Sequence, residues 1–419
     1  MKKIYFLSLI FLLITGTSIS QNGWYQVSST PNPSYALSFI NIQTGYATSY
    51  QKIYKTTDGG VTWPTVYTST TNRPQEIQFL NESTGYVYDD ANGIFIKTNN
   101  GGSNWIEIPT GYGGNYHVEN FYFIDENIGF LGHNINIYKT TNGGVNWNIV
   151  FNYSYEIIAI TFINSNTGFA SSPGVILKST DQGNSWQTKA LDSLNVHIRK
   201  FCIINSNLVY GGGQANLYQG YLPKMYKTSN TGDNWILMPT NSPALLSGIC
   251  FIDSSIGYNA NGPGIYYTTN SGLTWGLQYQ SIGAATVNDI CFLNPLTGYA
   301  GGQTGTGILK TTNGGLTPVQ FLADEVPKNN KLLQNYPNPF NPSTKIKFDL
   351  PKLSNTKLII YDVLGCELAT LVNEQLKPGT YEVEWDGSNF ASGIYFYQIV
   401  IEDAERSRSV ETKRMILIK

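Results

Sequence analysis

The sequence predicts an all-β protein, a seven-bladed β-propeller followed by a small immunoglobulin-like β-sandwich. One eight-residue phrase recurs seven times at intervals of about forty residues, which is the period of a propeller blade. A second phrase recurs in step with the first, and short alternating apolar runs bounded by turn residues lie between the two. Beyond the last copy, the alternation of apolar and polar residues is typical of a separate antiparallel sandwich.

The first phrase reads Thr-Thr-Asp-Gly-Gly-Val-Thr-Trp from Thr56 to Trp63. Its acidic or amide residue can accept hydrogen bonds from a tight turn, its glycines permit positive φ, and its tryptophan can anchor the turn between blades. Five copies carry Asn in place of Asp, which does not suit a metal ligand or a catalytic acid, so a structural role is expected. The residues assigned to this role are Asp58, Trp63, Asn100, Trp105, Asn142, Trp147, Asp181, Trp186, Asn230, Trp235, Asn270, Trp275 and Asn313.

The second phrase, Phe-x-Asn/Asp-x-x-x-Gly-Tyr/Phe, runs from Phe39 to Tyr46 in its first copy. It recurs in every later unit, in degraded form from Ile203 to Tyr210 in the fifth. Two phrases in register, with short strand-like runs between them, leave room for about four strands per unit. Each unit is therefore interpreted as one blade.

The seventh copy of the first phrase lacks its tryptophan and carries Pro318 instead. Trp24 stands alone before the first unit, where the strand after such a tryptophan would be expected. We therefore expect the N-terminal strand to complete the seventh blade, because an open ring would expose two sheet edges to aggregation.

The first phrase resembles the Asp-box, the bacterial neuraminidase repeat, and the whole unit resembles the repeat of the photosystem II assembly and stability factor family. The resemblance covers about 300 residues. It implies a sialidase-like propeller in which the box is a structural turn on the outer rim, remote from any ligand.

The N-terminal residues 1–20 have the pattern of a signal peptide. Lys2 and Lys3 precede an apolar run from Ile4 to Ile14, and small residues at Ser18 and Ser20 suit cleavage. The run is too short to anchor the chain in a bilayer, and no membrane span is expected. The propeller is then assigned to residues 21–320 and a charged linker to residues 321–333.

Residues 334–419 resemble the type A C-terminal sorting domain of bacterial type IX secretion. The resemblance rests on the segments Gln334–Thr344, Ile359–Gly365, Trp385–Gly387 and Ala391–Phe396, and it extends through Lys419. It implies the type IX secretion machinery as a partner. It also implies secretion across the outer membrane, after which the protein is extracellular or attached to the cell surface.

Composition excludes several functions. Charged residues make up 13% of the chain, the formal net charge is −2, and the propeller holds two arginines, so nucleic-acid binding is not expected. Two arginines cannot form the three-arginine carboxylate clamp that the sialidase family uses. The histidines His117, His133 and His197 fall in different blades without metal-ligand spacing, and neither a metal nor a cofactor is expected.

The four cysteines are interpreted as small buried apolar residues. Cys202, Cys250 and Cys291 each precede the second phrase of successive blades by one residue, and equivalent points on different blades are expected to exceed the Cα limit of about 7 Å for bridging. Cys366 belongs to the other domain, so no disulfide is predicted.

The function expected from these observations is non-enzymatic binding of a protein or glycan through the face that carries the variable loops. The candidate ligand-binding residues on these loops are Arg73, Tyr112, Tyr116, His117, Tyr153, Tyr155, His197, Arg199, Tyr218 and Tyr221. The alternative is a glycoside hydrolase or lyase, which needs only two carboxyl groups at a suitable separation. Several carboxylates are not needed to hold a predicted turn, and no motif selects a pair among them. They are Glu76, Asp89, Asp90, Glu119, Glu156, Asp192 and Asp289.

Overall fold

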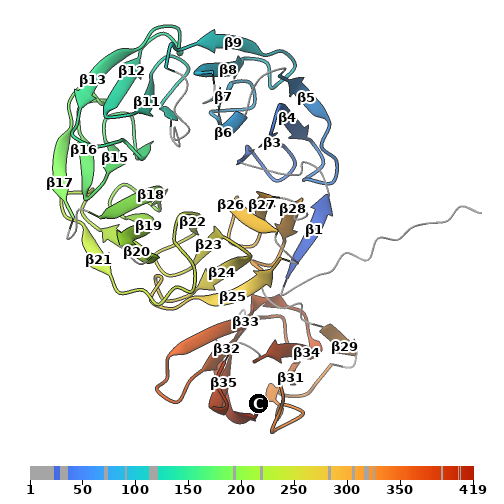
Figure 1. Ribbon diagram of the computed structural model, residues 1–419. Helices are drawn as coiled ribbons and strands as arrows, with labels where there is room; N and C mark the ends of the chain where they lie inside the picture. Colours follow the sequence, from blue (N-terminus) through green and yellow to red (C-terminus); the bar gives the residue numbers. More distant parts are fainter. Residues whose placement is uncertain are drawn as a thin grey trace, which may run out of the picture.

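The described residues form two all-β units in a computed structural model. They are residues 23–28, 36–69, 74–89, 92–112, 121–191, 195–217, 220–281, 285–303, 307–315, 320–323, 326–387, 390–403, 405 and 407–419. Their strands make nine four-stranded antiparallel sheets, of which seven form a ring and two form the C-terminal sandwich (Figure 1). The predicted propeller and sandwich are confirmed, whereas the predicted signal peptide at 1–20 lies outside the described residues.

In blades one to six, four consecutive strands run from the central channel to the outer rim. Blade one contains β2 (Leu37–Phe39), β3 (Gly45–Ser49), β4 (Lys52–Thr56) and β5 (Thr65–Thr68). Blade two contains β6 (Pro74–Phe79), β7 (Gly85–Asp89), β8 (Ile94–Thr98) and β9 (Ile106–Pro109). Blade three contains β10 (Phe121–Phe123), β11 (Gly129–His133), β12 (Asn136–Thr140) and β13 (Asn148–Asn152).

Blades four to six follow the same plan. Blade four contains β14 (Ala159–Phe162), β15 (Gly168–Ser172), β16 (Val175–Ser179) and β17 (Gln187–Ala190). Blade five contains β18 (Val196–Ile203), β19 (Val209–Leu217), β20 (Gly220–Thr228) and β21 (Ile236–Met238). Blade six contains β22 (Ile249–Phe251), β23 (Gly257–Asn261), β24 (Gly264–Thr268) and β25 (Gly276–Gln280).

The seventh blade joins the two ends of the propeller. Its inner strands are β26 (Thr286–Phe292), β27 (Gly298–Gln303) and β28 (Ile308–Thr311), and its outer strand is β1 (Trp24–Ser28). β1 pairs antiparallel with β28, with Trp24 opposite Thr311. The N-terminal strand therefore closes the ring, as the sequence led us to expect.

Trp24 occupies the place of the missing box tryptophan. Its side chain is fully buried, and its Nε1 donates a hydrogen bond to Gln278 Oε1 at 3.1 Å. Its ring meets Phe292 edge to face at 5.9 Å and 89°, which matches the Trp63–Phe39 pair of blade one at 5.9 Å and 88°. The same tryptophan contact therefore recurs where the chain closes on itself.

Aromatic pairs join each blade to the next, and they are stacked at every interface except the one between blades four and five, where the pair is tilted. Tyr46 of blade one lies on Phe79 of blade two at 3.6 Å and 10°, and Tyr299 of blade seven lies on Phe39 of blade one at 3.8 Å and 14°. The glycine of the second phrase makes room for this stack, because a Cβ on Gly45 would come within 2.5 Å of the Phe39 ring. The second phrase thus stabilises the interfaces between blades.

The box turn is held by its Asp or Asn side chain. Asp58 Oδ1 accepts hydrogen bonds from Thr56 Oγ1 at 2.8 Å and from the Thr62 backbone N at 2.9 Å, while Asp58 Oδ2 accepts the Thr62 hydroxyl. Asn100 makes the corresponding Oδ1 bonds with Thr98 and Asn104. Because one oxygen makes the bonds that hold the turn, an amide can replace the carboxylate.

The C-terminal sandwich packs two four-stranded sheets around a single apolar core. One sheet contains β29 (Gln320–Ala323), β34 (Gly379–Asp386), β31 (Ser343–Leu350) and β30 (Lys331–Leu332). The other contains β33 (Glu367–Leu376), β32 (Ser354–Tyr361), β35 (Gly393–Asp403) and β36 (Arg408–Leu417).

The predicted linker at 321–333 is corrected by two strands of this sandwich. β29 pairs with β34 and β30 pairs with β31, so both ends of the segment are bonded into the sheet. The two strands have four and two residues and lie at the edges of the sheet, so neither is long enough to show the alternation by which a strand is predicted.

Candidate binding site at the channel mouth

Three inner strands depart from the regular blade. In the part of the chain that the structure describes, β6, β18 and β26 are six to eight residues long, whereas the other inner strands have three or four. Each long strand carries a β-bulge toward its N-terminal end, between Pro74 and Glu76, between Ile198 and Lys200, and between Val287 and Asp289. Because a bulge redirects side chains, these strands can turn two consecutive residues to the channel.

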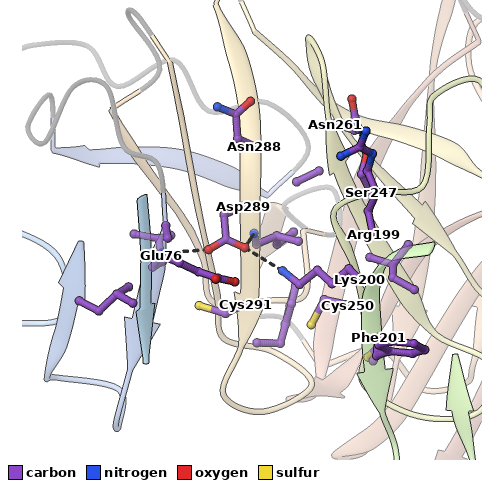
Figure 2. Close-up of a pocket in the computed structure, with 18 of the residues that line it drawn as sticks. Glu76, Arg199, Lys200, Phe201, Ser247, Cys250, Asn261, Asn288, Asp289 and Cys291 are labelled. Carbon is purple, nitrogen blue, oxygen red and sulfur yellow. Dashed lines mark hydrogen bonds and ion pairs between the residues drawn. The ribbon is translucent and has the colours of Figure 1, made fainter. Parts of the chain in front are cut away.

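The bulged strands line a cavity of about 710 Å³, which we call the channel-mouth pocket. The side chains redirected into it come in neighbouring pairs. They are Gln75 and Glu76, Arg199 and Lys200, and Asn288 and Asp289. A smaller cavity of about 210 Å³ adjoins the pocket and shares Glu76 and Lys200 with it. In Figure 2, Arg199, Ser247, Asn261 and Asn288 lie on one side of the Lys200–Asp289 contact, and Cys250 and Cys291 lie on the other.

An ion pair crosses the pocket between blades five and seven. Lys200 Nζ lies 2.8 Å from Asp289 Oδ1, and Asp289 Oδ2 accepts the Leu37 backbone N–H of blade one at 2.9 Å (Figure 2). The side chains are 35% and 17% exposed. Burial opposes the charged form of Lys200, but the attraction and hydrogen bond of Asp289 prevail and raise the pKa of Lys200. Lys200 therefore stays charged, and its contact with Asp289 ties three blades together.

The second carboxylate of the pocket also contacts a neighbouring blade. Glu76 Oε2 accepts a hydrogen bond from the Phe121 backbone N–H of blade three at 3.3 Å. Of the carboxylates that the sequence singled out, the structure brings Glu76 and Asp289 into one pocket. Asp89 is buried at the end of β7 and Glu156 is exposed, while Asp90, Glu119 and Asp192 lie outside the described residues.

Three cysteines also line the channel-mouth pocket, where Cys202, Cys250 and Cys291 are half-buried, and Cys366 is exposed in the sandwich. The interpretation of all four as small buried residues is therefore wrong. Cys202 also contacts the neighbouring blade, because its Sγ accepts the backbone N–H of Phe251, the residue that follows Cys250, at 2.9 Å. Blades are wedge-shaped and converge on the channel, which brings equivalent inner-strand positions close together.

Of the predicted ligand-binding residues, Arg199 lines the channel-mouth pocket. His197, two residues earlier on β18, has its Nε2 3.1 Å from Asn216 Nδ2. Burial lowers the pKa of His197, and the nearby Arg199 adds to the effect. Four further candidates, Arg73, Tyr116, His117 and Tyr218, lie outside the described residues.

The remaining four candidates divide by exposure. Tyr112 packs on Tyr138 at 4.2 Å, and Tyr153 stacks on Phe151 at 6.2 Å, so both belong to contacts within the protein. Tyr155 and Tyr221 are 51% and 61% exposed, respectively. These two tyrosines remain candidates for an external contact.

Sequence reasoning missed Lys200, Ser247, Asn261 and Asn288. A signal for part of this set was present, because two polar residues follow each other inside an inner strand in Gln75–Glu76, Arg199–Lys200 and Asn288–Asp289. Strict alternation would have placed one of each pair away from the channel. A break in alternation at the same place in three blades could have indicated the bulges.

The described ranges contain no helix long and apolar enough to cross a membrane. Within the same ranges, no group of three His, Cys, Asp or Glu side chains is placed to hold a metal ion.

The comparison with family models identifies the C-terminal unit of the chain. A family model described as the secretion system C-terminal sorting domain matches residues 334–417. No curated protein matches the chain by sequence.

Three solved structures of different proteins share the fold of this chain. YCF48 bound to D1 peptide is 18% identical over 71% of this chain and 99% of its own, with a TM-score of 0.55. The GH74 xyloglucanase from Xanthomonas campestris is 12% identical over 78% of this chain and 59% of its own, with a TM-score of 0.53. The extracellular domain of BT4673 from B. thetaiotaomicron is 11% identical over 96% of this chain and 60% of its own, with a TM-score of 0.50.

At these identities the likeness shows the fold, whereas the family model assigns the C-terminal unit. A sorting domain of this kind directs export across the outer membrane to the cell surface or the extracellular space. The chain is therefore a β-propeller exported by type IX secretion through its C-terminal sorting domain.

Proposed function

We propose that the chain is a non-enzymatic binding protein that recognises a protein or glycan through its variable-loop face, with the channel-mouth pocket at the centre. The observation that carries the proposal is the set of three bulges on β6, β18 and β26. Bulges are over-represented beside functional sites because they redirect side chains. Here they occur at the same end of three inner strands and turn polar side chains toward a single cavity.

The pocket offers both donors and acceptors to a ligand. Arg199 supplies a guanidinium, and Asn261 and Asn288 supply amides that can donate and accept. The exposed rings of Tyr155 and Tyr221 lie at the same end of the blades, in a connection that enters an inner strand and in the β19–β20 hairpin. Amide groups with tyrosines suit a sugar or the backbone of an extended peptide.

The bonding of the two carboxylates favours binding over catalysis. Asp289 is neutralised by Lys200 and accepts two backbone N–H groups, from Leu37 and Ile290. Glu76 accepts the Phe121 N–H of the next blade. Carboxylates held by neighbouring blades are positioned to stabilise the ring. YCF48, a propeller of this fold solved with a D1 peptide, offers a precedent for peptide binding.

The second candidate is a glycoside hydrolase. It is favoured by one observation, that Glu76 and Asp289 line the same pocket, since such enzymes use two carboxyl groups flanking the scissile bond. A xyloglucanase with this fold shows that the scaffold can carry that chemistry.

The test is a glycan array and a peptide pull-down with the purified chain, followed by affinity measurements on the hits. Arg199→Ala and Asn288→Ala should each weaken binding at least tenfold, which is about 1.4 kcal/mol. Lys189→Ala, on the outer strand β17, is the matched control and should bind as wild type.

A reducing-end assay on a polysaccharide panel distinguishes the two candidates. Sugar release by the wild type that disappears in Glu76→Gln would establish the hydrolase. Binding that depends on Arg199 without sugar release would establish the binding protein. Binding that survives both pocket substitutions would contradict the proposed site.

A further inference from the structure

A cysteine of blade five contacts the segment of blade six that carries a second cysteine, and both cysteines line the channel-mouth pocket. Cys202 and Cys250 occupy the same position in their blades, one residue before the last residue of the inner strand. Cys202 Sγ accepts the Phe251 backbone N–H at 2.9 Å and lies 3.5 Å from the Phe251 carbonyl oxygen. Because Phe251 directly follows Cys250, this contact places one thiol against the segment that bears the other.

The crossing is a regular feature of the ring. The equivalent side chain of blade one, Ser38, accepts the Phe79 N–H of blade two at 3.2 Å, and Gln78 accepts the Phe123 N–H of blade three at 2.8 Å. The inner strands therefore use this position to hydrogen-bond the next blade. Cysteines occupy this position in blades five, six and seven, and between blades five and six the Cys202 thiol lies against Phe251, the residue that follows Cys250.

The surroundings favour a reactive thiol at Cys250. The hydrogen bond from Cys202 lowers the pKa of Cys250 and outweighs burial, and the Lys200 ammonium lowers the pKa further. The same contact, with burial, raises the pKa of Cys202. A thiolate is the nucleophile in thiol–disulfide exchange, so Cys250 is the better placed of the two to react first.

We propose that Cys202 and Cys250 are a redox-active pair that closes to a disulfide across the floor of the channel-mouth pocket when the exported chain meets a low-molecular-weight disulfide. The pocket gives such an oxidant access, since both cysteines line it. Cysteine side chains are short, so the contact of Cys202 Sγ with the backbone N–H next to Cys250 brings the two cysteine backbones toward the range in which a disulfide forms. Export brings the chain into an oxidising environment, where disulfides persist.

The reaction balances in two exchanges. The Cys250 thiolate attacks one sulfur of the oxidant, breaks its S–S bond, forms a mixed disulfide and releases one small thiolate. Cys202 loses its proton and its sulfur attacks Cys250 Sγ, which forms the intramolecular bond and releases the second small thiolate. The two cysteines are oxidised by two electrons, the oxidant is reduced to two thiols, and these take up the two protons.

The experiment uses the full wild-type chain, purified under reducing conditions and then exposed to oxidised glutathione. Non-reduced peptide mapping by mass spectrometry should recover the peptides of Cys202 and Cys250 linked to each other, with the mass of two hydrogens lost. Cys291 should keep its free thiol, and the exposed Cys366 should carry at most a glutathione adduct. A reductant should restore both thiols.

Two variants sharpen the result. Cys202→Ser lacks the thiol that displaces glutathione from Cys250, so glutathione should remain attached to Cys250. In Cys291→Ser, the matched control, the cross-link should form as in wild type. The proposal fails if Cys202 and Cys250 stay free while Cys366 is modified, if each carries its own glutathione, or if Cys250 links to Cys291.

Discussion

The outer rim and the channel mouth of the propeller are built from the same repeat. The rim keeps the repeat nearly unchanged from blade to blade, whereas the mouth departs from it in three blades. At the rim, Asp58 and Asn100 hold their turns with corresponding hydrogen bonds, and even the blade whose tryptophan is missing recovers one from the N-terminus. At the mouth, three inner strands are lengthened and bulged, whereas the remaining four described ones are not. Repetition stabilises the ring, and departures from it mark the place where function is expected.

The two regions also differ in the sequence distance of their contacts. A box turn bonds residues two to four positions apart, as Asp58 does with Thr56 and Thr62. At the mouth, Lys200 meets Asp289 across 89 residues, and Leu37 meets Asp289 across 252. Rim substitutions should therefore act on one turn, whereas mouth substitutions should act on several blades at once.

The largest effect is expected at the closure of the ring. Trp24→Ala leaves a cavity between blades six and seven and removes the donor to Gln278, so it should cost about 3 to 5 kcal/mol of unfolding free energy. Trp147→Ala, in the body of the ring, is the control and should cost a similar amount. Equal denaturation midpoints for wild type and Trp24→Ala, with Trp147→Ala clearly lower, would show that the N-terminal strand does not stabilise the ring.

The ion pair at the mouth is expected to give a smaller effect than the closure of the ring. Lys200→Met leaves Asp289 without its cation, and the expected cost is about 1 to 2 kcal/mol, reduced by the partial exposure of both side chains. A double-mutant cycle with Asp289→Asn should show favourable coupling. The Lys178–Asp233 pair at the rim, where the Asp233 side chain is 64% exposed, should show weaker coupling. Equal coupling in both pairs would contradict a special role for the mouth.

The carboxylate of the first box gives a pH-dependent effect. Its bonds from Thr62 and Thr56 lower the pKa of Asp58 from 3.8 to about 2. Because the folded-state pKa lies below the unfolded one, this stabilisation is present above pH 3.8 and is lost as pH falls toward about 2. At neutral pH, Asp58→Ala should cost about 1 to 3 kcal/mol and leave ligand binding intact.

Asp58→Asn is the matched variant, because an amide already serves at Asn100. It should keep the turn while flattening the acid limb of the stability profile, measured by urea unfolding between pH 5 and pH 2. An unchanged acid limb would mean that this carboxylate does not carry the effect. Loss of binding in Asp58→Ala without loss of stability would assign the box a role in ligand recognition.

The smallest effect on the ring is expected from removing the sorting domain. No described strand of residues 334–419 belongs to a propeller sheet, and β29 pairs within the sandwich. A chain ending at residue 319 should keep the unfolding midpoint of the propeller and accumulate in the periplasm. The full chain in the same type IX host is the control, and surface exposure of the truncated chain would contradict the assignment.

The blade repeat, the closure by Trp24 and the sorting domain could be predicted from sequence. Each is indicated by short motifs and by the position of those motifs along the chain. A glycine opposite Phe39 or an oxygen acceptor at Asp58 acts within a hairpin or a turn, so its signal lies in consecutive residues. The strands at 320–323 and 331–332 were not predicted, because strands of four and two residues are too short to show a pattern of alternation.

The channel mouth required the tertiary structure. Lys200, Asp289 and Leu37 belong to blades five, seven and one, and they meet because the ring closes and the inner strands converge on its axis. The contact of Cys202 with Phe251, the residue after Cys250, has the same origin, since wedge-shaped blades are nearest to each other at the channel. A period along the chain specifies what each blade contains, whereas the distances between blades at the axis depend on the closed ring and on the bulges that redirect its side chains.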